Sequence, residues 1–275
     1  MRGGRSITVR AVVAAVAAIV AVAALAGCEA GTDVSAAGLS AGTTSSTPTP
    51  TSSATTTTTA PPTHAAQPYP FGEPQAHAPA IAGGKAPVIR HIDTGGKKYV
   101  FITIDDGAVR EPQALDLIKN SDARPTLFLN DHYVKGHEDY FKQLQDKDDL
   151  VIGNHTVNHP DLSKMSYAAQ RKEICDDSDA FATAFGHRPT LFRPPFGSFN
   201  ADTQRAAADC GLKALVLWTA AVNDGVVQFQ GGKQLKAGDI VLMHFRKTFV
   251  QDYTAFINRA KQDGLTPVPL SDWLA

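Results

Sequence analysis

Two pairs of side chains in this sequence are suited to binding a metal ion. Asp105 and Asp106 are adjacent and follow an apolar run, and His155 and His159 are four residues apart. On a helical turn, residues at i and i+4 share a face, so these two imidazoles would hold one ion. Adjacent carboxylates repel each other unless a cation or another partner satisfies one of them. Each pair alone is typical of a solvated surface, but the two together favour a divalent metal site.

Further polar residues follow other apolar segments of the chain. They are Arg193, Asp224 and His244, and Trp218 is expected as a pocket wall or a core residue. In barrels of alternating strands and helices, the active site gathers at the carboxyl ends of the strands. The shared position of these residues after predicted strands therefore indicates one site.

Strands and helices are expected to alternate over residues 87–275, a pattern that predicts a mostly parallel sheet or barrel. We count about seven strands, one fewer than a full eightfold barrel. The expected fold class is α/β, as a distorted and incomplete (β/α) barrel. The expected strands are 99–104, 126–129, 150–152, 190–192, 212–218, 240–243 and 266–268, and the expected helices are 112–120, 137–145, 167–185, 200–211 and 249–261.

Residues 1–27 have the pattern of a secretory signal peptide. Three arginines precede an unbroken apolar run over residues 11–26, which is short for a membrane span of about 20 residues. The run ends in residues 25–28 (LAGC), which resemble the lipobox of bacterial lipoproteins. That resemblance implies a lipid on Cys28 and a protein held at the outer face of the cytoplasmic membrane, within reach of the cell wall.

The composition separates a tether from a folded domain. Residues 28–86 are rich in Thr, Ser, Pro, Ala and Gly, so we expect a disordered tether there and a single domain over residues 87–275.

The net charge of −1, with Lys+Arg 26 against Asp+Glu 27, argues against a nucleic-acid partner. Three cysteines exclude a disulfide scaffold and a thiolate zinc cluster. Cys175 and Cys210 either pair or stay as free thiols.

Several motifs, taken in their order along the chain, resemble those of the polysaccharide deacetylase family, the NodB-homology domain of carbohydrate esterase family 4. Residues 103–107 (TIDDG) resemble its first motif, residues 155–159 (HTVNH) its second and residues 193–197 (RPPFG) its third. His244 corresponds to the histidine of its last motif. The fourth motif departs from the family pattern, because Asp224 is followed by Gly225 where a tryptophan usually lines the acetyl pocket.

The resemblance implies a role for each matched residue. Asp106, His155 and His159 would bind a divalent metal, most often Zn²⁺ and alternatively Co²⁺ or Ni²⁺, with a position left open for water. Asp105 would be the general base and His244 the general acid. Arg193 would orient Asp105, and Asp224 would belong to the same network. The backbone N–H of Phe196 would stabilise the oxyanion, beside Pro195 and Trp218.

Three functions are compatible with these residues. The first is a metal-dependent hydrolase, acting as a monomer, that removes N-acetyl groups from N-acetylglucosamine-containing envelope glycans such as peptidoglycan or chitin-like polymers. An O-acetyl xylan esterase would use the same site. The second is a non-catalytic glycan-binding lipoprotein, for which a base, its orienting arginine and an acid would have no use. The third is a two-histidine, one-carboxylate iron oxygenase, a class that usually has an all-β fold.

Overall fold

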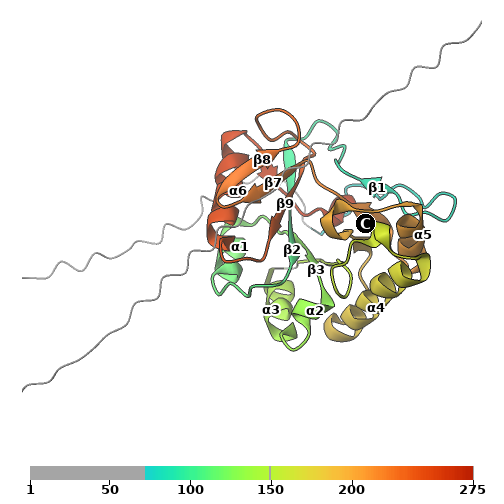
Figure 1. The fold of residues 1–275 in the computed structure, drawn as a ribbon. Coiled ribbons are helices and arrows are strands. Elements are labelled where there is room, and N and C mark those ends of the chain that lie inside the picture. The colour runs from blue at the N-terminus through green and yellow to red at the C-terminus, as the bar shows by residue number, and fades with distance from the viewer. Residues whose placement is uncertain (1–71, 149, 275) are drawn as a thin grey trace, which may run out of the picture. The chain divides into compact units, whose positions relative to one another are not determined.

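The computed structural model describes residues 72–148 and 150–274. Its centre is a sheet of 10 strands in the order β1-β6-β5-β4-β3-β2-β9-β7-β8, with β10 paired to β2 (Figure 1). Within the described residues no pairing joins β1 to β8, so the sheet is an incomplete barrel, as predicted. The strands are β1 Val88–Ile89, β2 Tyr99–Asp106, β3 Thr126–Leu129, β4 Ile152–Asn154, β5 Leu191–Phe192, β6 Ala214–Val216, β7 Ala220–Asn223, β8 Val226–Phe229, β9 Ile240–His244 and β10 Thr266–Pro267.

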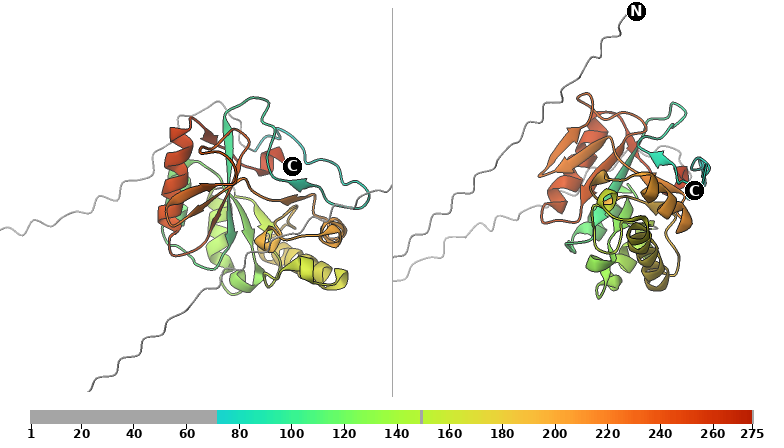
Figure 2. Two further views of the ribbon diagram at one scale, coloured as in Figure 1. Left: turned by 45° about the horizontal axis from the view of Figure 1, so that its top comes forward. Right: turned by 45° about the vertical axis from the view of Figure 1, so that its right-hand side comes forward.

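Helices lie outside the sheet and cover it. In Figures 1 and 2, α1 and α6 lie on one side of the sheet and α4 and α5 on the other. The described helices are α1 Ala114–Ser121, α2 Asp131–Val134, α3 Glu138–Asp148, α4 Tyr167–Phe185, α5 Ala201–Asp209 and α6 Phe249–Gln262, with the 3-10 turns η1 Leu162–Lys164, η2 Pro195–Gly197 and η3 Ser271–Trp273. No helix in this part of the chain is long and apolar enough to cross a membrane.

Strand β2 is the centre of the core because both of its faces are buried. Val100, Ile102 and Ile104 pack in the cluster that includes the inner faces of α1 and α6. Tyr99 and Phe101, on the opposite face, pack in a second cluster with residues of β3, β6 and η3. This alternation follows the two-residue period of a strand. A strand that is buried on both faces has a nearly continuous apolar sequence, so the strand at residues 99–104 could be predicted.

Capping residues set the bounds of the predicted helices. Ser166 begins α4 by accepting a hydrogen bond from the Ala169 N–H, and Gly186 ends the helix with a φ of 81°. Asn200 caps α5, and its side chain and that of Thr203 form a reciprocal capping box. The cap therefore lies at the first residue of the helix expected over residues 200–211.

The sheet has more strands than the sequence analysis expected. Strands β1, β7 and β8 were not predicted, and β7 and β8 form the one antiparallel pair among the described strands. Asp224 and Gly225 form their two-residue loop, and both have positive φ, 51° and 74°. An Asp-Gly pair between two short strands is a strong hairpin signal, because a type I′ turn needs positive φ at both positions.

The folded part begins before residue 87. The N–H of Gly72 donates to the Asp272 carboxylate at 2.9 Å, and the N–H of Gln75 donates to the Asp272 carbonyl at 2.8 Å. Ala86 is fully buried and its N–H donates to the Gln204 carbonyl. The tether prediction is therefore wrong for residues 72–86, because backbone hydrogen bonds attach a segment whose composition is typical of a linker. Residues 1–71, including the predicted signal peptide and Cys28, lie outside the described residues.

Cys175 and Cys210 form a disulfide. The bond joins α4 to the residue that follows α5, with the two Cα atoms 5.1 Å apart. This distance is within the range that a disulfide spans. The pairing, which the sequence analysis left open, is the one found.

Candidate active site

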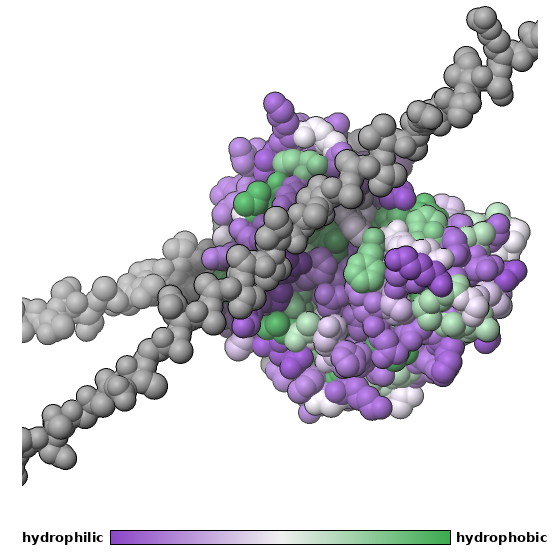
Figure 3. All heavy atoms as spheres, viewed as in Figure 1, coloured by the Kyte–Doolittle hydropathy of each residue, from purple (hydrophilic) through white to green (hydrophobic). Residues whose placement is uncertain are grey.

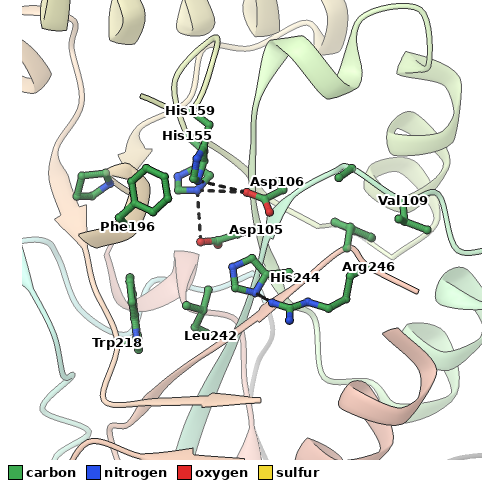
Figure 4. A pocket seen from close by; sticks show the side chains of 13 residues that line it. Asp105, Asp106, Val109, His155, His159, Phe196, Trp218, Leu242, His244 and Arg246 are labelled. Atoms are coloured by element: carbon green, nitrogen blue, oxygen red, sulfur yellow. Dashed lines mark hydrogen bonds and ion pairs between the residues drawn. The ribbon is translucent and has the colours of Figure 1, made fainter. Parts of the chain in front are cut away.

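A cavity of about 470 Å³ opens at the carboxyl ends of the central strands. The face seen in Figure 3 is largely hydrophilic with several hydrophobic patches. Phe196 is the large apolar side chain most exposed among the described residues, at 68%. In Figure 4 the charged side chains face one another across this cavity. The lining residues are Asp105, Asp106, Ala108, Val109, His155, His159, Pro194, Phe196, Trp218, Leu242, His244, Phe245 and Arg246.

Parallel pairing brings distant parts of the chain to this cavity. Asp105 is the register partner of His244, because β2 and β9 are neighbours. His155 directly follows β4, and Arg193 directly follows β5. The carboxyl ends of parallel strands lie at one edge of the sheet, so the predicted strand-end residues converge there.

Asp106, His155 and His159 have the arrangement of a metal site. Their ligand atoms all lie within 4.8 Å of one another. The Asp106 Oδ1 lies 3.6 Å from the Nε2 atom of each histidine, and it is buried without a hydrogen-bond partner. A buried carboxylate oxygen without a donor is costly unless a cation binds it. The three side chains therefore fit a divalent metal with an open coordination position.

The surroundings of His155 keep it in the form that binds a metal. Its Nδ1 lies 2.6 Å from the Arg193 carbonyl oxygen and donates a hydrogen bond to it, which leaves the Nε2 lone pair facing Asp106. Burial lowers the pKa of His155 to about 3, because the charged ring loses its hydration. A neutral imidazole is the ligand form, so this site is prepared for a cation.

The segment that carries the two histidines is a loop, and the helical turn expected there is absent. Thr156 and His159 have left-handed φ values of 72° and 56°. The Asn154 side chain accepts a hydrogen bond from the Thr156 N–H at 3.0 Å, and the Thr156 hydroxyl accepts one from the His159 N–H at 3.0 Å. Side-chain hydrogen bonds to nearby backbone compete with helix formation. The ring centroids of the histidines are 4.8 Å apart, so the loop brings them together without a helix.

Arg193 and Asp105 form a buried ion pair. The Arg193 Nη1 lies 2.7 Å from the Asp105 Oδ1, and the two residues are 0% and 2% exposed. Arg193 also donates to the Val216 carbonyl and to the Thr103 hydroxyl, and its guanidinium packs over the Phe128 ring. Burial raises the pKa of Asp105, and the charge of Arg193 opposes that rise. The expected contact between Arg193 and Asp105 is present, and their roles stay predictions.

His244 faces Asp105 and is bonded on its other side by an arginine that the sequence analysis did not single out. Arg246 donates a hydrogen bond to the Nδ1 of His244. Burial lowers the pKa of His244; the charge of Asp105 raises it, and that of Arg246 lowers it further. Arg246 lies two residues after His244, the last residue of β9. Because side chains alternate between the two faces of a strand, this spacing indicates that Arg246 lies on the same side as His244. The spacing could therefore have identified Arg246 from the sequence.

The remaining predicted residues divide into two groups. Phe196 and Trp218 line the cavity, and the Phe196 ring lies 4.6 Å from that of His159 with a left-handed φ of 60°. Pro195 is buried in η2, and Pro194 lines the cavity in its place. Asp224 is exposed in the β7–β8 turn and is not among the lining residues. The expectation that Asp224 joins the Asp105–Arg193 network is therefore wrong, since hairpin geometry explains its position.

Comparisons with known sequences agree with this geometry. A family model described as polysaccharide deacetylase matches residues 92–215. An uncharacterised protein of Streptomyces coelicolor is 40% identical over 56% of this chain and 62% of its own length. A peptidoglycan-N-acetylglucosamine deacetylase of Bacillus cereus is 34% identical over 54% of this chain and 73% of its own. A peptidoglycan-N-acetylmuramic acid deacetylase of Bacillus subtilis is 28% identical over 54% and 60%.

Solved structures share the fold. A family 4 carbohydrate esterase of Bacillus anthracis superposes with a TM-score of 0.58 at 25% identity, covering 71% of this chain and 94% of its own. A family 4 pseudoenzyme of the same organism has a TM-score of 0.59 at 23% identity, covering 70% and 69%. The second similarity is one of fold alone.

Proposed function

Because the chain belongs to the polysaccharide deacetylase family, we propose that it is a hydrolase that removes N-acetyl groups from an acetamido sugar of the cell envelope. The observation that carries this proposal is the convergence of three groups on one cavity: the metal-site residues, the Asp105–Arg193 pair and His244. The deacetylase relatives act on peptidoglycan, which is the substrate class we propose.

Asp106, His155 and His159 would hold the metal, with Zn²⁺ first and Co²⁺ or Ni²⁺ as alternatives. A bound divalent metal would polarise the acetyl carbonyl as a Lewis acid and lower the pKa of water. The chain's own contribution is to place one carboxylate oxygen and two imidazole nitrogens close together.

Asp105 would act as the general base. Arg193 holds its Oδ1, while its Oδ2 lies 3.6 Å from the His155 Nε2, beside the metal site. A proton taken from water would therefore arrive on Oδ2. Arg193 is a positioning residue, because it orients the carboxylate and favours its ionised form against the effect of burial.

His244 would protonate the leaving nitrogen. An amine leaves an amide only when it is protonated, and a histidine is suited to that transfer near neutral pH. Both nitrogens of an imidazolium carry hydrogen, so the bond from Arg246 to Nδ1 exists only while His244 is neutral. Proton transfer through His244 thus requires Arg246 to release Nδ1.

The test is hydrolysis by the purified chain loaded with Zn²⁺. With acetylated peptidoglycan strands or acetylated chitin fragments, we expect equal amounts of free amine and acetate. Acetate without amine, from acetylated xylan, would indicate O-deacetylation. Binding without either product would indicate the non-catalytic glycan-binding alternative.

Asp105→Asn should lower kcat by about 10²–10⁴-fold while metal content stays at the wild-type level. Loss of the base removes proton transfer, but Asp105 is not one of the three proposed ligands. Asp224→Asn is the matched control, since that exposed turn residue lies outside the cavity and should leave kcat unchanged. A fully active Asp105→Asn variant would overturn the mechanism.

We further propose that Cys28 carries a lipid that holds the protein at the outer face of the cytoplasmic membrane. The LAGC sequence after the apolar run supports this proposal. In a cell that expresses the full chain, Cys28→Ala should move the protein from the membrane fraction to the soluble fraction. Unchanged membrane retention would argue against the lipid anchor.

A further inference from the structure

Arg246 is a half-buried cation at the wall of the cavity. Among residues 72–148 and 150–274, no carboxylate forms a salt bridge with it. Arg193, by contrast, is neutralised by Asp105. Partial burial of a guanidinium without a carboxylate in direct contact is unfavourable, so this part of the cavity is suited to receiving one.

The hydrogen bond to His244 does not satisfy Arg246. One Nη2–H donates to the imidazole, whereas a guanidinium has five N–H donors. In Figure 4 the Arg246 guanidinium lies beside His244, on the other side of the cavity from Phe196. Its position places it next to the group that would protonate the leaving nitrogen, and therefore next to the sugar that bears that nitrogen.

The neighbouring cations do not share this position. Arg110 donates to the carbonyls of Gly107 and Ala108, and it does not line the cavity. Lys247 is exposed and also lies outside the lining. Arg246 is thus the one arginine or lysine that lines the cavity in the described part of the chain, and it forms no salt bridge, although its charge lowers the pKa of Asp106.

We propose that Arg246 binds a carboxylate carried by the substrate sugar, which makes this chain selective for an acidic acetamido sugar. The proposal rests on the proposed deacetylase function and refines its substrate class. The planar guanidinium can pair two N–H donors with the two oxygens of a carboxylate. N-acetylmuramic acid has this chemistry, because an ether-linked lactyl group places a carboxylate next to its acetamido group. N-acetylglucosamine lacks that carboxylate.

The kinetic test compares two forms of one substrate. Peptide-free glycan strands with free lactyl carboxylates are set against the same strands with those carboxylates converted to methyl amides. For the wild-type chain with Zn²⁺, we expect kcat/KM to be higher for the charged strands by about tenfold to a hundredfold, as for a charge-assisted hydrogen bond. Arg246→Gln should bring the ratio near one, and Arg246→Lys should retain part of it. Lys247→Gln, which removes the same charge one residue away, should keep the wild-type ratio.

A binding test separates this proposal from the proposed function. Calorimetry with the metal-stripped chain, which does not depend on turnover, should show tighter binding of an N-acetylmuramic acid disaccharide than of its methyl amide. That preference should disappear in Arg246→Gln. If the preference is present but no glycan is hydrolysed, the deacetylase function fails and the Arg246 site stands. Hydrolysis with no preference in either test, or no binding of either ligand, overturns the Arg246 proposal.

Discussion

At the scale of single residues, burial controls the charge of the site. It lowers the pKa of His155 to about 3 and raises that of Asp105, so in both residues burial favours the neutral form. For His155 this is the ligand form. For Asp105 the 2.7 Å contact with Arg193 opposes the effect of burial, because a neighbouring cation favours the carboxylate.

The His244–Arg246 contact predicts the pH dependence of catalysis. Arg246→Gln removes a nearby cation and so favours the imidazolium, which raises the pKa of His244. A general acid works only while it is protonated, so the alkaline limb of kcat/KM should move to higher pH. The measurement uses an uncharged chitin oligomer, so that no substrate carboxylate contributes. An unmoved limb would mean that His244 is not the group that titrates.

Metal binding should be visible in thermal stability. Zn²⁺ at about 100 times its Kd stabilises a folded chain that binds it by about 2.7 kcal/mol. We expect the midpoint of unfolding to rise on Zn²⁺ addition, to fall on chelation, and to be insensitive to Zn²⁺ in Asp106→Asn. The same rise in that variant would place the metal elsewhere.

At the scale of elements, the loop after β4 depends on two asparagines, one directly after β3 and one at the end of β4. Asn130, which follows β3, donates to the Thr156 carbonyl at 3.0 Å. Asn154, the last residue of β4, donates to the Ile174 carbonyl and the Ser178 hydroxyl on α4. These buried amides support the loop in which Thr156 and His159 have left-handed backbone geometry, so α4 supports the metal site without contributing a ligand.

Removing one of these amides should weaken both the fold and the metal site. Asn154→Ala leaves the Thr156 N–H and the Ile174 carbonyl without their buried partner, which costs about 1–3 kcal/mol. The free energy of unfolding, from urea titration, should fall by that amount, and Zn²⁺ affinity should fall with it. Asn158→Ala, in the same loop but exposed, is the control and should retain Zn²⁺ affinity.

Element prediction succeeded where the sequence pattern was strong. The apolar run over β2 and the capped helices α4 and α5 were predictable because burial and capping leave local signals. The helical turn assumed at residues 155–159 was wrong, because Asn and Thr side chains bond the backbone there. The two-residue strand β1 was missed, since it is defined by its pairing with β6 and not by its own composition.

At the scale of the whole molecule, the disulfide joins two helices that lie on the same side of the sheet. Cys175 and Cys210 are separated by 35 residues, and their bond links α4 to the end of α5. Replacing both with serine should lower the free energy of unfolding by about 2–4 kcal/mol, largely because the unfolded chain becomes less constrained. Denaturant titration with and without a reductant checks this. A reductant should shift the wild-type midpoint and leave the double variant unchanged.

The motifs by themselves predicted the family and the barrel class, because residue type and order carry that information. They also named Asp105, Asp106, His155, His159, Arg193 and His244, which the fold brings close together and whose roles stay predictions. Tertiary structure decided three other matters. It placed Asp224 outside the cavity lining, placed Arg246 in that lining beside His244, and joined Cys175 to Cys210 by a disulfide. Each depends on which side chains meet after parallel strands align, and sequence spacing does not encode distances between segments far apart in the chain.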